Sequence, residues 1–245
     1  MKNKAFRLIA SSLTLRKIAK PKRNITTGCQ VDWRHHIIEQ TEVSTNHLTP
    51  EIPLRLITRN CPLWHQKEDE SVFKDPFWAF YWPGGQALTR FILDHPEVVR
   101  GRSVLDVGSG CGASAIAAVK SGASQVTAND IDLVAIEAIH LNCELNSVTI
   151  ATSLDDLIGS QSRGNWEVVF LGDMFYDEEF TDRVHEWTRS LSGSSIFIGD
   201  PGRLFLANHP LKKELNLVHR VELPDSSKEE NYGFTEGYVW EIVNR

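Results

Sequence analysis

The stretch Ser103–Gly112 reads SVLDVGSGCG, and it decides how the rest of the chain is interpreted. Its first five residues have the length and apolar composition of a buried strand. Three glycines follow at every second position: Gly108, Gly110 and Gly112. Glycine is needed where the backbone takes a positive φ, or approaches a ligand without a Cβ in the way. The small residues of Cys111–Ser121 then predict a helix that ends at Gly122, so the stretch indicates a strand–loop–helix unit with a ligand at the carboxyl end of its strand.

Strands and helices continue to alternate after this unit. The predicted strands are Gln125–Ala128, Val148–Thr152, Trp166–Gly172 and Ser195–Gly199, and the predicted helices are Leu133–Asn146 and Glu178–Leu191. Two further apolar segments, Leu215–Leu223 and Tyr238–Val243, have no helix predicted between them and fit an antiparallel edge. The pattern predicts an α/β, Rossmann-like fold with a seven-stranded, mostly parallel sheet, an antiparallel edge strand and helices on both faces.

The residues before the glycine loop predict an extension. The segment Asp32–Asp75 is polar and turn-rich apart from Leu54–Ile57. Asp75-Pro76 is a helix-start signal, with an acid at the cap and proline at the first helical position. Another helix is predicted over Gln86–Leu93. We therefore divide the chain into a leader at 1–31, an N-terminal helical extension at 32–95 and a core domain at 96–245.

Charge separates the leader from the body. Residues 1–31 contain eight Lys or Arg and no acid. Because the whole chain has 26 basic and 32 acidic side chains, the remainder has 18 basic and 32 acidic ones, a net charge of −14. A basic, acid-free leader that contains Ser and Thr is typical of a mitochondrial transit peptide, although a disordered basic arm or a nucleic-acid-binding tail has a similar composition. The acidic body favours a positively charged protein partner over nucleic acid.

Other classes of protein are disfavoured by composition. No apolar run approaches the roughly 20 residues that span a bilayer, so no membrane insertion is expected. The four cysteines are scattered without a CxxC spacing, which fits free thiols and argues against a zinc site or a disulfide framework. No bound metal is expected.

Two acids mark the ligand site of the core domain. Asp106 stands two residues before the first glycine, where a carboxylate can order the loop and meet a cationic amino acid moiety. Asp130 follows the next predicted strand, and a carboxylate there can accept both hydroxyls of a ribose. Gly108, Gly110 and Ala113 also satisfy the pattern of dinucleotide enzymes. The acid at 106 and the glycine at 112 favour S-adenosylmethionine instead, as in the Rossmann-like methyltransferases that this segment resembles.

An aromatic stretch precedes the core domain, and residues 77–85 read FWAFYWPGG. Aromatic rings stack on an adenine and attract a sulfonium cation by about 0.5–2 kcal/mol. Trp82 and the following Pro83-Gly84-Gly85 are predicted to form a wall of the cofactor site, with Gly84 turning the backbone in towards the ligand. Phe77, Phe80 and Tyr81 are expected to pack in the core.

A second group of candidate residues follows the strand Trp166–Gly172. Asp173 and Tyr176 form a D-x-x-Y spacing like that of the seven-strand protein lysine methyltransferases, without the prolines of an NPPY or DPPY motif. A carboxylate at Asp173 can hold and orient a lysine ammonium, and Tyr176 can supply an aromatic or hydroxyl wall. The alternative is that Asp173 caps the next helix and Tyr176 packs on it. The turn at 199–203, GDPGR, fits a capping acid and a substrate-facing loop equally well.

The motifs taken together resemble one family. The segments FWAFYWPGGQAL, SVLDVGSGCGASAIAA, ANDID, LNCELN, LGDMFYD and GDPGR are similar to the mitochondrial lysine methyltransferases of the electron transfer flavoprotein beta subunit, over about residues 45 to 245. The resemblance implies S-adenosylmethionine as co-substrate, a location in the mitochondrial matrix, and methylation of lysines near the surface by which the flavoprotein meets its dehydrogenases. The loop Gly159–Asn165 is the least similar part, so the residues that contact adenine around Ser153–Asp156 stay open.

The resemblance also assigns roles to single residues. Asp106, Gly108, Gly110 and Asp130 correspond to cofactor-binding positions, and Gly112 completes their loop. Asp173 and Tyr176 correspond to the catalytic D-x-x-Y element, with Asp173 also next to the cofactor. Three other functions compete: a methyltransferase of another protein such as a ribosomal protein, a dinucleotide-binding oxidoreductase, and a non-catalytic module that keeps only the fold.

Overall fold

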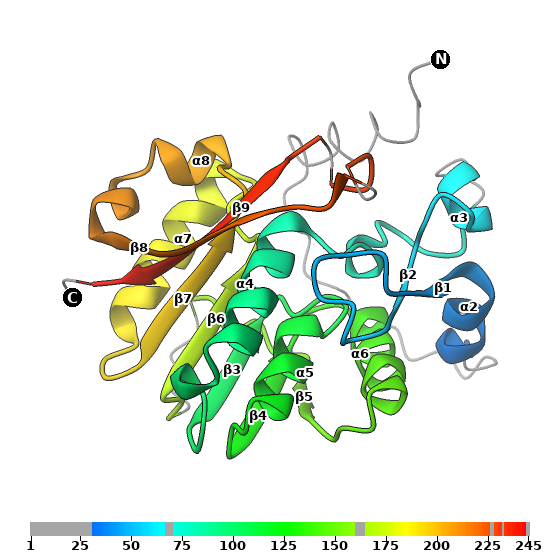
Figure 1. Cartoon of the computed structure of the whole chain (residues 1–245), viewed down its shortest axis with the longest axis horizontal. Helices are drawn as coiled ribbons and strands as arrows, with labels where there is room; N and C mark the ends of the chain where they lie inside the picture. Colours follow the sequence, from blue (N-terminus) through cyan, green and yellow to red (C-terminus); the bar gives the residue numbers. More distant parts are fainter. Residues whose placement is uncertain (1–30, 67–70, 160–164, 226–227, 232, 244–245) are drawn as a thin grey trace.

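The computed structural model describes residues 31–66, 71–159, 165–225, 228–231 and 233–243. The predicted leader, apart from its last residue, and residues 160–164 of the loop Gly159–Asn165 lie outside this part of the chain. The elements are shown in Figure 1. They are α2 (Trp33–Gln40), β1 (Glu42–Ser44), β2 (Leu54–Leu56), α3 (Pro62–His65), η2 (Phe77–Ala79), α4 (Pro83–Asp94), η3 (Pro96–Val98), β3 (Ser103–Val107), α5 (Ala113–Lys120), β4 (Gln125–Asn129), α6 (Leu133–Leu145), β5 (Ala151–Ser153), β6 (Val168–Gly172), α7 (Glu178–Ser190), β7 (Ser195–Asp200), α8 (Leu204–Ala207), η4 (Pro210–Glu214), β8 (Leu215–Glu222) and β9 (Glu236–Ile242).

The main sheet confirms the predicted fold. Among the described residues it has seven strands in the order β5-β4-β3-β6-β7-β9-β8. The five strands from β5 to β7 are parallel, and β9 runs antiparallel to both β7 and β8. The antiparallel strand therefore lies one place inside the edge, which β8 forms (Figure 1). The carboxyl ends of β3, β4, β6 and β7 lie at one edge of the sheet, where a doubly wound sheet binds its ligand.

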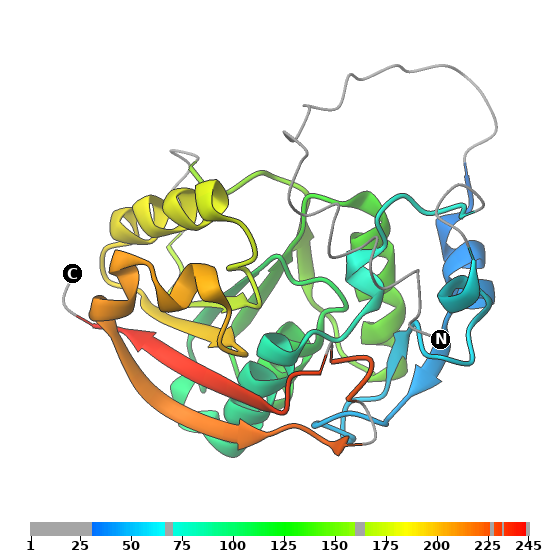
Figure 2. The same ribbon diagram turned by 90° about the horizontal axis from the view of Figure 1, so that it is seen from above.

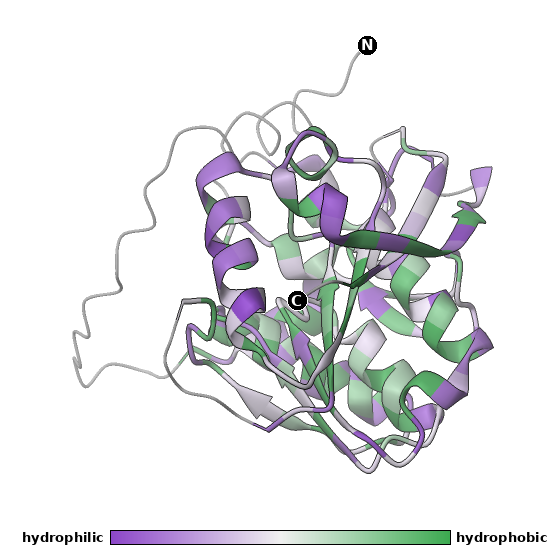
Figure 3. Cartoon of the chain, turned by 90° about the vertical axis from the view of Figure 1, so that its left-hand side faces the viewer, coloured by the Kyte–Doolittle hydropathy of each residue, from purple (hydrophilic) through white to green (hydrophobic). Residues whose placement is uncertain are grey.

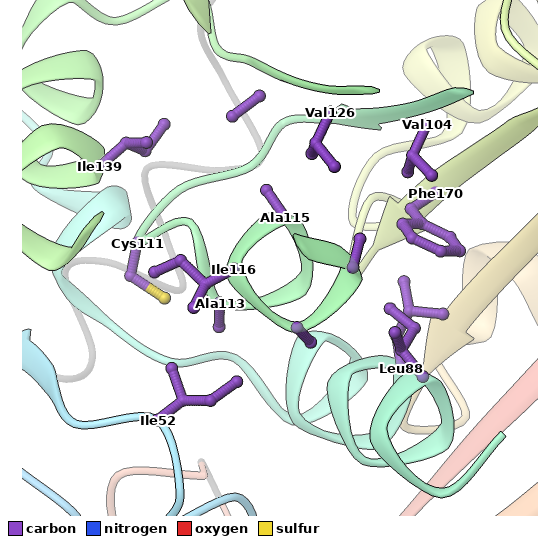
Figure 4. Packing of buried hydrophobic residues seen from close by; sticks show 14 of the residues in the cluster. Ile52, Leu88, Val104, Cys111, Ala113, Ala115, Ile116, Val126, Ile139 and Phe170 are labelled. Atoms are coloured by element: carbon purple, nitrogen blue, oxygen red, sulfur yellow. The ribbon is translucent and has the colours of Figure 1, made fainter. Parts of the chain in front are cut away.

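Alternating side chains divide the core into two layers. Val104 and Phe170 face α4 and α5, and pack with Leu88, Ala115 and Ile116 in the cluster drawn in Figure 4. Their strand neighbours point to the other face of the sheet, because successive side chains of a strand alternate. That second layer contains Leu105, Val107, Val169, Leu171, Val184 and Trp187. Each central strand is buried on both faces, which explains its nearly continuous apolar sequence.

Helix α4 corrects one prediction from the sequence. The helix was predicted to begin at Gln86, but Pro83-Gly84-Gly85 forms its first turn, with Pro83 at the start of the helix and Trp82 as its N-cap. Proline suits this position because its fixed φ matches a helix and its missing N–H would have no partner there. A Cβ at Gly84 would overlap the carbonyl oxygen of Gly199 on β7, so glycine lets α4 lie directly against the sheet. Residues 83–94 thus pack with the core although they were assigned to the extension.

The extension packs against α6. Ile37 of α2, Trp78 of η2 and Ala138 of α6 belong to one buried cluster. Figure 2 shows α2, β1, β2 and α3 gathered beside α6, at the end of the molecule opposite α7 and α8. The extension is not only helical, because β1 and β2 form an antiparallel pair. The division of the chain at residues 95/96 stays a prediction.

Asp75-Pro76 does not begin an α-helix as predicted. Only a single 3-10 turn, Phe77–Ala79, follows it, and its N-cap residue Pro76 supplies no side-chain hydrogen bond. Asp75 has a φ of +50°, a left-handed conformation in which it does not act as a helix N-cap. The aromatic residues that follow pack into the core instead of extending the turn.

Polar residues cover the outer faces of the helices. In Figure 3 the turns of α7 that face outward are hydrophilic, and hydrophobic residues concentrate on the sheet. No helix in the described part of the chain is long and apolar enough to cross a membrane.

Candidate functional site

The glycine loop between β3 and α5 has the conformation that its sequence predicts. Gly108, Gly110 and Gly112 have φ values of +63°, +55° and +82°. This region is strained for residues with a side chain, so all three glycines are explained by backbone geometry alone. Gly112 is also the N-cap of α5, and a Cβ there would lie 3.2 Å from Ile139. Within the loop, the Ser109 N–H donates to the Asn129 carbonyl at 3.0 Å and the Gly112 N–H donates to the Ser109 carbonyl at 2.9 Å.

Two carboxylates hold this loop. Ser109 Oγ donates to Asp106 Oδ2 at 2.5 Å, and the Gly110 N–H donates to Asp130 Oδ2 at 3.0 Å. The other oxygen of Asp130 accepts the Asp132 N–H at 3.0 Å. The structure thus brings Asp106, Asp130 and the glycines together, as the sequence predicts. Asp106 orders the loop as expected.

Burial changes the acidity of both carboxyl groups. The pKa of Asp106 is raised to about 7, because burial disfavours its charged form more than the Ser109 hydroxyl favours it. The pKa of Asp130 is raised to about 6 for the same reason, although backbone N–H groups oppose the change. Two carboxyl groups that ionise near neutral pH beside an electropositive loop suit a ligand that brings positive charge or hydroxyl donors.

Two apolar side chains lie beside Asp130: Ile131, which was not singled out from the sequence, and Leu154, which belongs to the range Ser153–Asp156 that was left open. Ile131 is 60% exposed and Leu154 is 47% exposed. They lie after the neighbouring strands β4 and β5, which the Asp130 N–H joins by a hydrogen bond to the Ser153 carbonyl at 3.1 Å. Exposed aliphatic side chains at this edge can pack on a flat ring such as adenine. Their signal in the sequence is an apolar residue one or two positions after a strand end, where a solvent-facing turn favours polar residues.

The aromatic stretch lies against the glycine loop. A Cβ at Gly110 would be 3.8 Å from the Trp78 Cα, so η2 borders the loop. Phe80 and Tyr81 are each only 7% exposed, which confirms that they pack in the core. Trp82 is half-buried, and its Nε1–H donates to the Phe77 carbonyl at 2.8 Å. Its predicted contact with a cofactor stays a prediction.

Asp173 occupies an unusual position at the carboxyl end of β6. Its φ is +61°, and its N–H donates to the Gly199 carbonyl at 2.8 Å. Its side chain is 2% exposed. The Gly84 N–H donates to Oδ2 at 2.6 Å, and Arg203 Nε donates to Oδ1 in an ion pair. Gly84, predicted to contact a cofactor, therefore binds the predicted catalytic acid through its backbone.

A different residue caps the helix after β6. Asp177 Oδ1 accepts the Phe180 N–H at 2.9 Å at the start of α7. Asp173 is not the helix cap, which removes the structural alternative considered for it. A non-glycine residue with positive φ and a buried carboxylate points to a functional constraint.

Tyr176 packs as the alternative reading predicted, and it also lies near the cofactor half of the site. Its ring stacks on Phe180 with centroids 5.3 Å apart and an interplanar angle of 17°. Burial raises its pKa to about 12, and the negative charges of Asp130 and Asp177 add to this effect. The side chain is half-buried, so its ring can form a wall between the two groups of candidate residues.

The turn after β7 brings a second acid to Asp173. Asp200 Oδ1 accepts the N–H groups of Gly202 and Arg203 at 2.7 and 2.8 Å. Its Oδ2 is buried and has no hydrogen-bond partner in the part of the chain that the structure describes. Burial and the charge of Asp173 raise the pKa of Asp200 to about 7. The GDPGR turn thus has the predicted capping hydrogen bonds, and its Arg203 side chain pairs with Asp173, whereas its role towards a substrate stays a prediction.

The described residues contain no group of three or more His, Cys, Asp or Glu side chains placed to hold a metal ion. The site is instead made of backbone N–H groups, buried carboxyl groups, aromatic rings and one guanidinium. Such groups can bind a nucleoside with a charged tail and can hold an amine in place. A group-transfer reaction that is accelerated by positioning and electrostatics requires both.

Comparisons with known proteins agree with this chemistry. A Danio rerio protein described as electron transfer flavoprotein beta subunit lysine methyltransferase is 49% identical over 220 residues, which cover 88% of this chain and 85% of that protein. A Homo sapiens protein of the same description is 49% identical over 206 residues, covering 82% and 79%. A Caenorhabditis elegans protein described as a homolog is 35% identical over 229 residues, covering 84% and 94%.

Two broader comparisons concern the core domain. The family model of the ribosomal protein L11 methyltransferase (PrmA) matches residues 61–170. A crystal structure from Pyrococcus horikoshii, described as that of a candidate RNA methyltransferase, superposes with a TM-score of 0.50 at 15% identity and covers 70% of this chain and 91% of that one. At this identity the superposition supports the fold alone.

Proposed function

We propose that this chain, which belongs to the family of electron transfer flavoprotein beta subunit lysine methyltransferases, transfers methyl groups from S-adenosylmethionine to lysine side chains of that flavoprotein subunit. The proposal rests on two groups of candidate residues that lie at the same edge of the sheet. We call them the cofactor half and the acceptor half of the site. A glycine loop held by Asp106 and Asp130 lies at β3 and β4, and the buried Asp173 lies at β6.

The cofactor half fits S-adenosylmethionine. The positive φ values of the three glycines form the tight turn after β3, and Asp106 lies where it can meet a charged amino acid moiety. Asp130 can accept the hydroxyls of a ribose, and Ile131 and Leu154 offer apolar surface to the adenine. When bound, S-adenosylmethionine supplies a methyl group on a positively charged sulfur.

The acceptor half suits a lysine amine. Its ordinary pKa is about 10.4, and the amine must lose a proton before it can accept a methyl group. Removal from water and a nearby positive charge both lower that pKa. Asp173 can hold the incoming ammonium and set its direction, because the backbone of β7 and the Gly84 N–H fix the position of the acid. Tyr176 would limit access of water from the side of α7.

Substrate and location follow from the family and from charge. The body of the chain carries a net charge of −14, which complements a lysine-bearing surface. The basic leader supports import into the mitochondrial matrix, where methylation of the flavoprotein would modulate its contact with dehydrogenases. If the leader directs import, deletion of residues 1–27 sends a fluorescent fusion to the cytosol. Continued import of the shortened fusion would refute this location signal.

Labelled S-adenosylmethionine and a mitochondrial extract test the substrate. The purified enzyme should label one principal band, and mass spectrometry should identify that band as the flavoprotein beta subunit. Purified ribosomal protein L11 is the matched alternative acceptor, because the PrmA family model matches residues 61–170. Label on L11 and none on the flavoprotein would overturn the proposed substrate.

Calorimetry separates the cofactor classes. We expect S-adenosylmethionine to bind and NAD or NADP to give no heat of binding, because Asp106 would repel a pyrophosphate. Binding of NAD without S-adenosylmethionine would replace the proposal with the oxidoreductase reading.

A further inference from the structure

The Arg203 side chain occupies surroundings that suit an amine. Its Nε donates to Asp173 Oδ1, and its guanidinium carbon lies 5.8 Å from the Trp82 ring centroid and 5.7 Å from the Phe234 ring centroid. A carboxylate with two aromatic faces is the combination that binds alkylammonium cations, through ion pairing and cation–π attraction. In this structure the cation is supplied by the chain itself.

Asp173 is closed to an external lysine while this contact persists. One of its oxygens accepts the Gly84 N–H and the other pairs with Arg203, and only 2% of the side chain is exposed. A target ammonium can therefore pair with Asp173 only if Arg203 leaves. The proposed role of Asp173 in orienting the amine requires a movement of this one side chain.

We propose that the Arg203 side chain is an internal stand-in for the target lysine, holding the ammonium subsite of Asp173, Trp82 and Phe234 until a protein lysine displaces it. The proposal rests on the proposed function, since it takes Asp173 to be the acceptor-orienting acid. It makes Arg203 a specificity-determining residue, because only a cation that competes with a guanidinium can open the site.

The structure allows the side chain to move without its backbone. The Arg203 N–H is held by Asp200 Oδ1 at 2.8 Å, which anchors the main chain of the turn. The Arg203 side chain is 18% exposed, and the next residue, Leu204, is 74% exposed. The guanidinium therefore lies between the buried acid and solvent, and can swing outward from a fixed Cα.

Charge balance also favours an entering cation. Asp173 and Asp200 are two buried carboxyl groups, and the Arg203 guanidinium pairs with Asp173 alone, whereas Asp200 Oδ2 has no hydrogen-bond partner among the described residues. The pKa of Asp200 is raised by burial and by the charge of Asp173. The cations around the two acids therefore do not fully balance their negative charges. A lysine ammonium that enters as Arg203 turns outward keeps the cluster paired throughout the exchange.

Arginine is suited to this role because its charge does not depend on pH. A guanidinium stays protonated in proteins, so it pairs with the buried acid whatever the pH of turnover. A lysine in the same place would keep a positive charge through a single ammonium group. An arginine can thus satisfy the buried acid between turnovers.

Kinetics of two variants test the stand-in. Arg203→Met keeps an unbranched apolar chain against the two rings and removes the charge, and Arg203→Lys keeps a cation as the matched control. Removing the competitor should lower KM for the flavoprotein subunit about fivefold or more, with kcat within about twofold and the Kd of S-adenosylmethionine unchanged. Arg203→Lys should give a smaller change in KM. A fall in kcat at constant KM would show that Arg203 only positions Asp173 and would overturn the proposal.

A spectroscopic test on the wild-type enzyme does not depend on the protein substrate. The Nε–H resonance of Arg203 is assigned by its absence in Arg203→Lys. The enzyme with bound S-adenosylhomocysteine is then titrated with n-butylammonium, which reproduces a lysine side chain, and with n-butanol as the uncharged control. We expect butylammonium alone to shift the resonance towards that of a solvated arginine. A resonance unmoved throughout the titration contradicts the proposal.

The two tests separate the two hypotheses. If the wild-type enzyme methylates no flavoprotein subunit while butylammonium displaces Arg203, the substrate is wrong and the ammonium subsite stands. If the subunit is methylated while Arg203 stays paired with Asp173, the function stands and the stand-in is wrong.

Discussion

The two halves of the site are built in different ways. At β3 and β4, Asp106 and Asp130 accept from Ser109 and Gly110, whose donors belong to the loop itself. At β6 and β7, Asp173 accepts from residues 89 positions before it and 30 positions after it in the chain, Gly84 and Arg203. The cofactor half is a local motif with uncharged donors. The acceptor half is assembled from distant segments of the chain and contains an ion pair. Substitutions of its residues should therefore have larger and more specific effects on activity.

Removal of the Asp173 charge should have the largest effect. Asp173→Asn keeps the shape and the Gly84 contact but loses the anion that orients the amine, so kcat should fall by about 100- to 1000-fold. The Kd of S-adenosylmethionine, measured by calorimetry, should change little, because the loop at β3 is intact. Asp177→Asn is the matched control, since asparagine also caps helices well. Equal turnover in Asp173→Asn and wild type would remove this acid from the mechanism.

Substitution in the cofactor half should affect binding instead. Asp106→Asn and Asp130→Asn each weaken a charged hydrogen-bond acceptor, at a cost of about 1.5–3 kcal/mol, or roughly 10- to 100-fold in the Kd of S-adenosylmethionine. At saturating S-adenosylmethionine, kcat should stay close to that of the wild type. A loss of kcat without a loss of affinity would mean that the two halves do not divide the work as we propose.

Gly84 links the halves, and its substitution should affect stability. A Cβ at Gly84 would overlap the Gly199 carbonyl, whereas one at Gly85 would have its nearest contact 3.8 Å away, on Tyr81. Gly84→Ala should therefore lower the free energy of unfolding by about 1–3 kcal/mol. Gly85→Ala should leave it unchanged or raise it by up to about 1 kcal/mol, because alanine favours a helix. Denaturant unfolding of the pair measures the difference, and equal stability would show that α4 can move away from β7.

The smallest expected effect is that of pH on the cofactor half. The pKa values of Asp106 and Asp130 are raised to about 7 and about 6, and the ionised forms bind the ligand. Affinity for S-adenosylmethionine should fall on the order of tenfold from about pH 8 to about pH 5.5. The ligand-free protein should respond with the opposite sign. An acid whose pKa is raised in the folded protein binds its proton at a higher pH in the native state than in the unfolded state. The free energy of unfolding therefore rises as the pH falls through 7.

Asp106→Asn is the control for this titration. In this variant the affinity for S-adenosylmethionine should no longer change around pH 7. The decrease near pH 6, which is due to Asp130, should remain. An affinity independent of pH in the wild type would contradict the assignment of these acids to the cofactor.

The same contrast explains what the sequence could predict. The strand Ser103–Val107 was predicted with the bounds that the structure shows, and the loop glycines and Asp130 were predicted in their places, because strand length, φ requirements and spacing are local properties. The end of β7 was placed within one residue, at 199 instead of 200. Tertiary contacts shift such ends: β5 covers Ala151–Ser153 instead of Val148–Thr152, because its register follows β4.

The acceptor half could be predicted only in part. Asp173 was found from its motif, but no local signal connects it to Arg203 or to Gly84. Pro83-Gly84-Gly85 was placed outside the helix because the reason for Gly84 lies on β7, in the approach of Gly199. Phe234, which completes the surroundings of Arg203, lies in a turn with no motif at all. Contacts of this kind depend on how distant segments pack against each other, and they leave no recognisable pattern in a single sequence.

The most direct test is the mass of the purified flavoprotein beta subunit after incubation with the purified enzyme and S-adenosylmethionine, followed by mapping of the modified residues. We predict that the subunit gains mass in whole methyl steps, that every added methyl lies on a lysine Nζ, and that no mass is gained when S-adenosylmethionine is omitted. An unmodified subunit under conditions in which calorimetry shows bound S-adenosylmethionine would contradict the account.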